Sequence, residues 1–122
     1  MAYIPEQGDA VWIDFNPQIG HEQAGRRPAL ILSPLSYNRK VRLALLCPIT
    51  SRVKGYPFEV AIPSGEKVSG VILSDQVKSL DWQQRNVEFI AKLPDEIVNE
   101  VMKKLKTLLH NLKQNNIGLS TQ

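Results

Sequence analysis

Two polar segments of the chain contain residues that could carry out chemistry. The first, residues 16–28, holds an acid, Glu22, and two adjacent arginines, Arg26 and Arg27. Pro28 disfavours a helical conformation for the residue before it, so Arg27 should lie at the start of a strand. A strand holds a guanidinium more rigidly than a mobile loop does, which suits a catalytic cation.

The second polar segment, residues 48–57, follows an apolar run at residues 43–47. It places two hydroxyls, those of Thr50 and Ser51, directly after this candidate strand, and basic residues including Lys54 come next. Hydroxyls and cations of this kind can donate hydrogen bonds to a phosphate.

Together these side chains could cleave RNA without a metal ion, because RNA carries its own nucleophile in the 2′-hydroxyl. Glu22 would accept the 2′ proton, Arg27 would bind two phosphate oxygens, and Thr50 would donate a hydrogen bond to a non-bridging oxygen. Arginine is a poor base, but Arg27 could protonate the departing 5′ oxygen. A surface Glu–Arg ion pair beside a turn threonine explains the same residues, and the residues alone leave both interpretations open.

Other common chemistries lack their motifs in this sequence. It has no Cys and His residues at zinc spacing, no paired carboxylates of the magnesium-nuclease type, no Gly-rich phosphate loop and no nucleophile-elbow serine. We therefore expect no metal and no cofactor. The single Cys47 cannot form an intramolecular disulfide and is expected to be a small core residue. His21 is expected to be an ordinary loop residue.

Composition sets the size and class of the protein. The 122 residues suffice for one domain, and 43% apolar with 22% charged residues is typical of a folded protein. The net charge of +3 is compatible with a polyanionic partner but does not require one. The apolar runs are too short to cross a membrane and the N-terminus does not resemble a signal peptide, so we expect a cytoplasmic protein.

Hydrophobic patterning predicts a mainly β fold that ends in a helix. Short apolar or alternating segments separated by Gly and Pro indicate strands. They fall at residues 9–15, 29–32, 41–46, 58–62, 70–74 and 87–91. The uninterrupted apolar run at 29–32 indicates a strand with both faces covered. Helical spacing of apolar residues over 95–112, with acids early and lysines late, predicts a C-terminal α-helix. We expect a small barrel or sandwich as a single domain over residues 1–112, followed by a polar tail at 113–122.

Several local strings, read together, resemble the MazF/PemK family of toxin endoribonucleases. They are GD at 8–9, WIDF at 12–15, EQAGRRPA at 22–29, LSP at 32–34, YN at 37–38, PIT at 48–50, KGYPFEV at 54–60 and DQVKS at 75–79. The resemblance covers residues 8–85. It implies a mainly β (α+β) fold, the SH3-like small β-barrel of the MazF/PemK/CcdB type with a C-terminal helix, that forms a homodimer. It also implies a toxin of a type II toxin–antitoxin system that cleaves single-stranded RNA (mRNA) at a short sequence without a metal, leaving 2′,3′-cyclic phosphate and 5′-hydroxyl ends.

The resemblance also assigns roles to residues. The family's catalytic arginine, threonine and acid fall on Arg27, Thr50 and Glu22. Other positions in or near the family-like strings could bind RNA, although Phe15 is as readily a core residue as a platform for a base. Arg26 lies at a position that varies in the family, where its extra charge could tune affinity. These candidates are Phe15, Arg26, Ser51, Lys54, Gln76, Lys78 and Arg85.

Partners and alternatives follow from the same resemblance. A toxin of this kind implies an antitoxin with an acidic segment, contact with operator DNA only through that antitoxin, and no membrane. The same fold is used by toxins such as CcdB that bind DNA gyrase, so fold alone does not decide the activity. A non-enzymatic gyrase-binding toxin and an antitoxin-bound transcriptional autoregulator are therefore the alternatives. The Glu22, Arg27 and Thr50 set favours the nuclease, because a gyrase-binding toxin does not need it.

Overall fold

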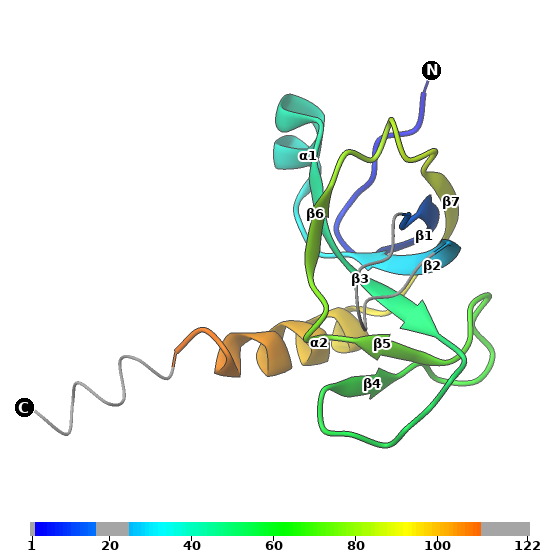
Figure 1. The fold of residues 1–122 in the computed structure, drawn as a ribbon, viewed down its shortest axis with the longest axis vertical. Coiled ribbons are helices and arrows are strands. Elements are labelled where there is room, and N and C mark those ends of the chain that lie inside the picture. Colours follow the sequence, from blue (N-terminus) through cyan, green and yellow to red (C-terminus); the bar gives the residue numbers. More distant parts are fainter. Residues whose placement is uncertain (1, 17–24, 111–122) are drawn as a thin grey trace, which may run out of the picture.

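The computed structural model describes residues 2–16 and 25–110, and within them it contains one antiparallel sheet and two helices (Figure 1). The predicted polar tail at 113–122 lies outside the described residues. The strands are β1 (Asp9–Asp14), β2 (Arg26–Ile31), β3 (Ala44–Thr50), β4 (Glu59–Ala61), β5 (Val71–Leu73), β6 (Lys78–Leu80) and β7 (Glu88–Lys92). The helices are α1 (Leu35–Val41) and α2 (Asp95–Thr107). The mainly β fold with a C-terminal helix is thus confirmed.

Strand β3 is the centre of the sheet. The strand order is β4-β5-β3-β2-β1-β7, and β6 also pairs with β3. One side of β3 pairs with β2, while on the other side residues 44–46 pair with β6 and residues 49–50 pair with β5. In the described part of the chain β4 and β7 end the path, so the sheet matches the expected fold without closing into a continuous barrel.

Two elements were not predicted from the sequence, and the first of them, α1, replaces the start of the expected strand at 41–46. Helix α1 begins after Pro34 and is capped at its C-terminal end by Arg42, whose φ of 68° is left-handed and whose backbone N–H donates to the carbonyl of Asn38. Strand β3 therefore starts later than expected, and it continues through Pro48 to Thr50. Pro48 falls between the residues of β3 that pair with β6 and those that pair with β5, where the missing N–H is tolerated. The second unpredicted element is the short strand β6.

The C-terminal helix is confirmed, but it ends at Thr107 and not at residue 112. The backbone N–H of Leu108 bonds to the carbonyl of Leu105, which tightens the last turn. Leu108 and Leu109 continue the apolar pattern but are exposed in this chain. Apolar spacing extends a helix only where the apolar side has something to pack against.

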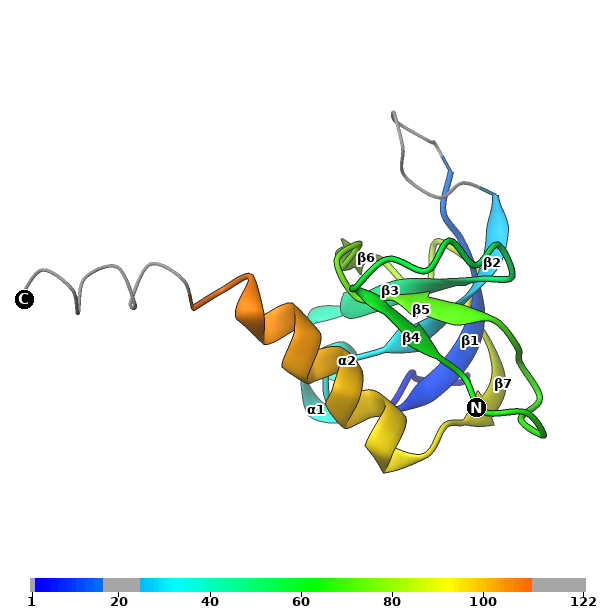
Figure 2. The ribbon, with the colours of Figure 1, turned by 90° about the horizontal axis from the view of Figure 1, so that it is seen from below.

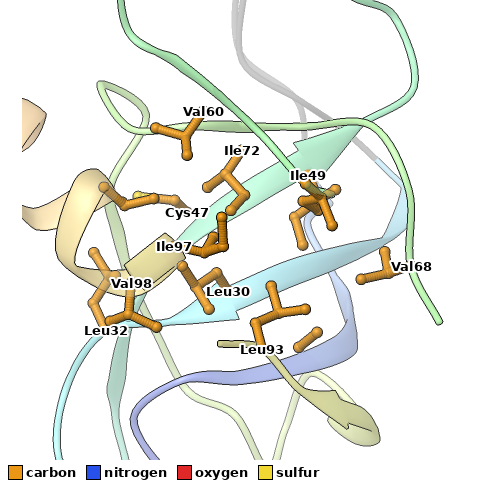
Figure 3. Packing of buried hydrophobic residues seen from close by; sticks show 13 residues of the cluster. Leu30, Leu32, Cys47, Ile49, Val60, Val68, Ile72, Leu93, Ile97 and Val98 are labelled. Carbon is orange, nitrogen blue, oxygen red and sulfur yellow. The ribbon is translucent and has the colours of Figure 1, made fainter. Parts of the chain in front are cut away.

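The sheet buries hydrophobic residues on both faces, in two clusters. The helix-side cluster lies between the sheet and α2 and is shown in Figure 3. The second cluster covers the opposite face and consists of Val11, Ile13, Phe15, Ala29, Ile31, Ala44, Leu46, Leu80 and Trp82. Successive residues of β2 alternate between them, since Leu30 belongs to the first and Ala29 and Ile31 to the second. This confirms the expectation that the apolar run at 29–32 has both faces covered.

A buried polar network attaches α1 to the rest of the fold. The Asn38 amide donates to the carbonyls of Pro5 at 2.8 Å and Ser33 at 3.0 Å, and its oxygen accepts the Ser33 hydroxyl at 2.5 Å. The indole N–H of Trp82 donates to the backbone carbonyl of Asn38 at 3.1 Å. Asn38 is fully buried, so each of these bonds replaces one that water would otherwise make.

The two tryptophans should differ in their contribution to stability. Trp82→Phe removes the bond to Asn38 and leaves a small void, because this side chain is only 5% exposed. It should lower the free energy of unfolding by about 1–2 kcal/mol, measured by urea denaturation. Trp12→Phe is the matched control, since Trp12 is 40% exposed and should change stability by less than about 0.5 kcal/mol. Equal losses in the two variants would contradict the role given to the network.

Candidate active site

Strand pairing places Arg27 and Thr50 on the same face of the sheet. The register of β2 with β3 runs from Ile31 opposite Leu46 to Ala29 opposite Pro48. Arg27 and Thr50 each lie two residues beyond that last pair, so they share its face. Ala29 belongs to the second cluster, and Arg27 and Thr50 therefore form a polar end to that apolar face. As predicted, Arg27 lies near the start of a strand, as the second residue of β2.

Lys78 belongs to the same face. It pairs with Leu46, and two residues later Leu80 pairs with Ala44. Leu46, Leu80 and Ala44 are all members of the second cluster. Three strands thus bring Arg27, Thr50 and Lys78 to one face of the sheet, where each side chain is partly or fully buried. Such a combination of cations and a hydroxyl is suited to binding a phosphate.

The hydroxyl of Thr50 is held in a defined orientation. Its oxygen accepts the backbone N–H of Arg52 at 3.1 Å, and the residue is only 7% exposed. Because the oxygen is used as an acceptor, the hydroxyl proton is directed elsewhere and can be donated to a phosphate oxygen.

Gly70 is a positioning residue that sequence reasoning did not identify. A Cβ atom at Gly70 would lie 2.2 Å from the carbonyl oxygen of Thr50, and the φ of Gly70 is +113°. Only glycine allows the chain before β5 to approach Thr50 this closely. The available signal was a glycine at the edge of a strand-like segment, which marks a close backbone approach.

The predicted acid Glu22 and the loop residue His21 lie outside the described residues. The assignment of Glu22 as proton acceptor therefore rests on the sequence and the family resemblance.

Arg26 and Arg85 are occupied by contacts with β1, with Asn16 after it and with β7. The Arg26 guanidinium pairs with Asp14 at 3.4 Å and with Glu88 at 3.1 Å. Arg85 donates to the backbone carbonyls of Asp14 at 3.2 Å and Asn16 at 2.7 Å. Arg26 alternates with Arg27 along β2, so the two side chains point to opposite faces. The structure thus separates Arg26 from Arg27 and gives both Arg26 and Arg85 structural partners.

Phe15 is not available as a stacking platform. It is 3% exposed and belongs to the second cluster, together with Val11 and Ile13 of the same strand. Its ring therefore packs in the core, and we do not include it in the proposed RNA-binding surface.

The remaining predicted binding residues lie in two loops. Ser51 and Lys54 are exposed in the loop that follows β3. Gln76 precedes β6, and its side-chain oxygen is buried with no hydrogen-bond partner among the residues that the structure describes. A buried acceptor without a partner is unfavourable, so this amide is suited to accept a bond from a ligand.

Asp14 provides a test of the contacts around β1. The Asn86 amide donates to its carboxylate at 2.9 Å and, together with Arg26, lowers the pKa of Asp14. A lowered folded-state pKa stabilises the fold above the ordinary carboxyl pKa, and this contribution is lost as the pH falls through the folded value. Asn86→Gly removes the amide while tolerating the positive φ of 57° at this position. NMR titration of the variant should show a higher Asp14 pKa, and an unchanged value would contradict the assignment.

In the described part of the chain, neither the Cys47 thiol nor a group of metal-binding side chains forms a second reactive site. Burial, with a contribution from Asp75, raises the pKa of Cys47 to about 12, so its thiol is a poor nucleophile at neutral pH. Among residues 2–16 and 25–110, no three His, Cys, Asp or Glu side chains are grouped so that they could hold a metal ion. The helices of these segments include none long and apolar enough to span a membrane.

Comparisons with known proteins give consistent matches in sequence and in structure. The family described as PemK-like, MazF-like toxin of type II toxin–antitoxin system matches residues 6–109. The endoribonuclease toxin MazF of Escherichia coli K12 is 44% identical over 107 residues, covering 88% of this chain and 96% of the relative. The crystal structure of MazF from Deinococcus radiodurans is 53% identical with a TM-score of 0.86, covering 88% of this chain and 98% of that one. A MazE–MazF complex from the same organism is matched at 47% identity with a TM-score of 0.79, covering 88% and 97%.

Proposed function

Because the chain belongs to the family of PemK-like, MazF-like toxins of type II toxin–antitoxin systems, we propose that it is an endoribonuclease that cleaves single-stranded RNA without a metal ion. The observation that carries this proposal is the shared face of Arg27 and Thr50 at the polar end of the second cluster. The curated relatives from Escherichia coli are named as endoribonucleases at 36–44% identity, which supports the same activity here.

In the proposed reaction the RNA supplies the nucleophile. The 2′ oxygen attacks the adjacent phosphorus while Glu22 accepts its proton, and the bond from phosphorus to the 5′ oxygen breaks as that oxygen is protonated by Arg27. The products are a 2′,3′-cyclic phosphate and a 5′-hydroxyl. Arg27 and Thr50 stabilise the negative charge that develops on the non-bridging oxygens.

The proposed RNA-binding surface extends from this face into the neighbouring loops. Lys78 lies on the same face, and Lys54 and Ser51 follow Thr50 directly. These side chains would bind phosphates and hold the strand in place, while the unpartnered Gln76 oxygen would accept a bond from a base amino group.

Partners are proposed on the same basis. Solved MazE–MazF complexes from Deinococcus radiodurans contain a toxin with its antitoxin. We propose that an antitoxin with an acidic segment covers the basic surface of this chain, and that operator DNA is contacted only through it. We further propose a homodimer, supported by the exposed apolar residues Leu45, on β3, and Val77, next to β6. The protein would act in the cytoplasm, where RNA is accessible.

The test is incubation of the purified protein with a long single-stranded RNA in excess EDTA, followed by mapping of the new ends. We expect discrete cuts at a short sequence, with cyclic phosphate and 5′-hydroxyl ends. A matched DNA strand should stay intact, because it has no 2′-hydroxyl. Intact RNA together with inhibition of DNA gyrase in a supercoiling assay would instead support the gyrase-binding alternative.

A further inference from the structure

The loop that leaves Thr50 is held by a carboxylate outside the proposed site. Glu59, the first residue of β4, accepts the backbone N–H of Lys54 at 2.9 Å with one oxygen and that of Gly55 at 2.8 Å with the other. Two consecutive backbone donors are thus bound to a single acid. Hydrogen bonds to a charged acceptor are among the stronger ones in proteins.

Helix α2 supports the same point of the fold. The Lys104 ammonium donates to the backbone carbonyls of Pro57 at 2.7 Å and Glu59 at 3.0 Å. Figure 2 shows α2 running alongside β4, and the two elements are in contact. The helix therefore fixes the backbone from which the Glu59 carboxylate reaches back into the loop.

The far end of the loop is attached to the β5–β6 connection. The Tyr56 hydroxyl donates to Asp75 at 2.7 Å, and burial together with this bond raises the pKa of Tyr56, so the hydroxyl keeps its proton. The Ser74 hydroxyl donates to the carbonyl of Phe58 at 2.5 Å. Residues 56–58 are thus held by α2 on one side and by the β5–β6 connection on the other. The Glu59 carboxylate in turn holds Lys54 and Gly55.

We infer that Glu59 is a positioning residue that fixes the basic loop at residues 51–55 in its RNA-binding conformation. This inference rests on the proposed function. Glu59 need not contact the substrate; it acts through the backbone of Lys54 and Gly55, whose φ of +84° marks a tight turn. Without the carboxylate the loop would have to be ordered on RNA binding, which weakens affinity.

The sign of the effect separates positioning from simple electrostatics. Removing an acid next to a basic loop would by charge alone strengthen the binding of RNA. Loss of loop order would weaken it. Two variants of Glu59 distinguish these effects, because Glu59→Gln removes the charge and Glu59→Asp keeps the charge but is too short to reach both N–H groups. Glu100→Gln is the matched control, since Glu100 is an exposed acid beside Lys104, with an N–O distance of 3.9 Å, and no hydrogen bond joins it to the loop.

The experiment measures steady-state cleavage of an RNA oligonucleotide containing the mapped cut site. Both Glu59 variants should raise KM by about tenfold, with kcat within about twofold of the unchanged protein, because Arg27 and Thr50 are held by the sheet. Their affinity for a 2′-deoxy analogue of the oligonucleotide should depend less on salt, with a slope lower by about 0.7 for each phosphate that the loop no longer binds. Amide hydrogen exchange at Lys54 and Gly55 should accelerate in the same variants, while melting temperatures show that they remain folded at the assay temperature.

The outcomes separate this inference from the proposed function. If the unchanged protein cleaves RNA but both Glu59 variants match Glu100→Gln in KM and salt dependence, the positioning role is wrong and the nuclease assignment stands. If amide exchange accelerates at Lys54 and Gly55 without any change in KM, the loop is anchored by Glu59 but its order does not serve binding, and the inference is again wrong. An unchanged protein that leaves RNA intact would instead overturn the proposed function.

Discussion

Replacement of Arg27 by alanine should lower kcat/KM for RNA cleavage by about 10³-fold, equivalent to roughly 4 kcal/mol of transition-state stabilisation. The sheet places Arg27 on the same face as Thr50, and the position of Arg27 within β2 gives it a fixed direction. The charge on the phosphate increases in the transition state, so most of the loss should appear in kcat. Arg27→Lys should recover only part of the rate, because an ammonium cannot bind two oxygens at once.

The neighbouring arginine is the matched control. Arg26→Ala removes the same charge from the adjacent residue, but Arg26 points to the other face and pairs with Asp14 and Glu88. It should change kcat/KM by less than about fivefold, because these are exposed ion pairs. Both variants are measured on the same oligonucleotide in EDTA. A comparable loss in both would mean that general charge, and not the orientation of Arg27, drives the reaction.

The sequence predicted individual residues well where local chemistry decides their environment. Pro28 correctly indicated that Arg27 belongs to a strand, and the apolar run at 29–32 correctly indicated a strand with both faces buried. The alternation of apolar residues at Val11 and Ile13 continues to Phe15, and it predicts the burial of the Phe15 ring that the structure shows. The alternative role of Phe15 in base stacking does not fit that burial. Period-two patterns are local, so they report which face a residue takes.

What the sequence could not predict depends on contacts between distant segments. The pairing of β2 with β3, which brings Arg27 and Thr50 to one face, joins residues about twenty positions apart, and no local pattern specifies that register. Strand β6 is only three residues long and is defined by its pairing with β3. The ion pairs of Arg26 likewise depend on β1 lying between β2 and β7. No local pattern shows this arrangement, so the charge of Arg26 suggested an RNA contact that the structure does not favour.

Gly70→Ala should destabilise the fold by about 3–5 kcal/mol, because it combines a strained positive φ with a steric clash. The new Cβ would lie 2.2 Å from the carbonyl oxygen and 2.8 Å from the carbonyl carbon of Thr50. The backbone of Thr50 and the backbone that follows Gly70 are held together by the pairing of Thr50 with Val71. Neither can move away from the new Cβ without breaking the hydrogen bonds between β3 and β5. Urea denaturation would give the loss of unfolding free energy.

Gly65→Ala isolates the contribution of the backbone conformation. Gly65 has a similar positive φ of +98°, but a Cβ there would meet nothing within 4 Å. It should therefore cost only about 1–2 kcal/mol and leave cleavage unchanged. In Gly70→Ala the folded fraction should also lose activity, since relief of the clash requires Thr50 to move. If Gly70→Ala were no less stable than Gly65→Ala, the contact between Gly70 and the backbone of Thr50 would not be rigid. The end of β3, which carries the Thr50 hydroxyl, could then shift without a loss of stability.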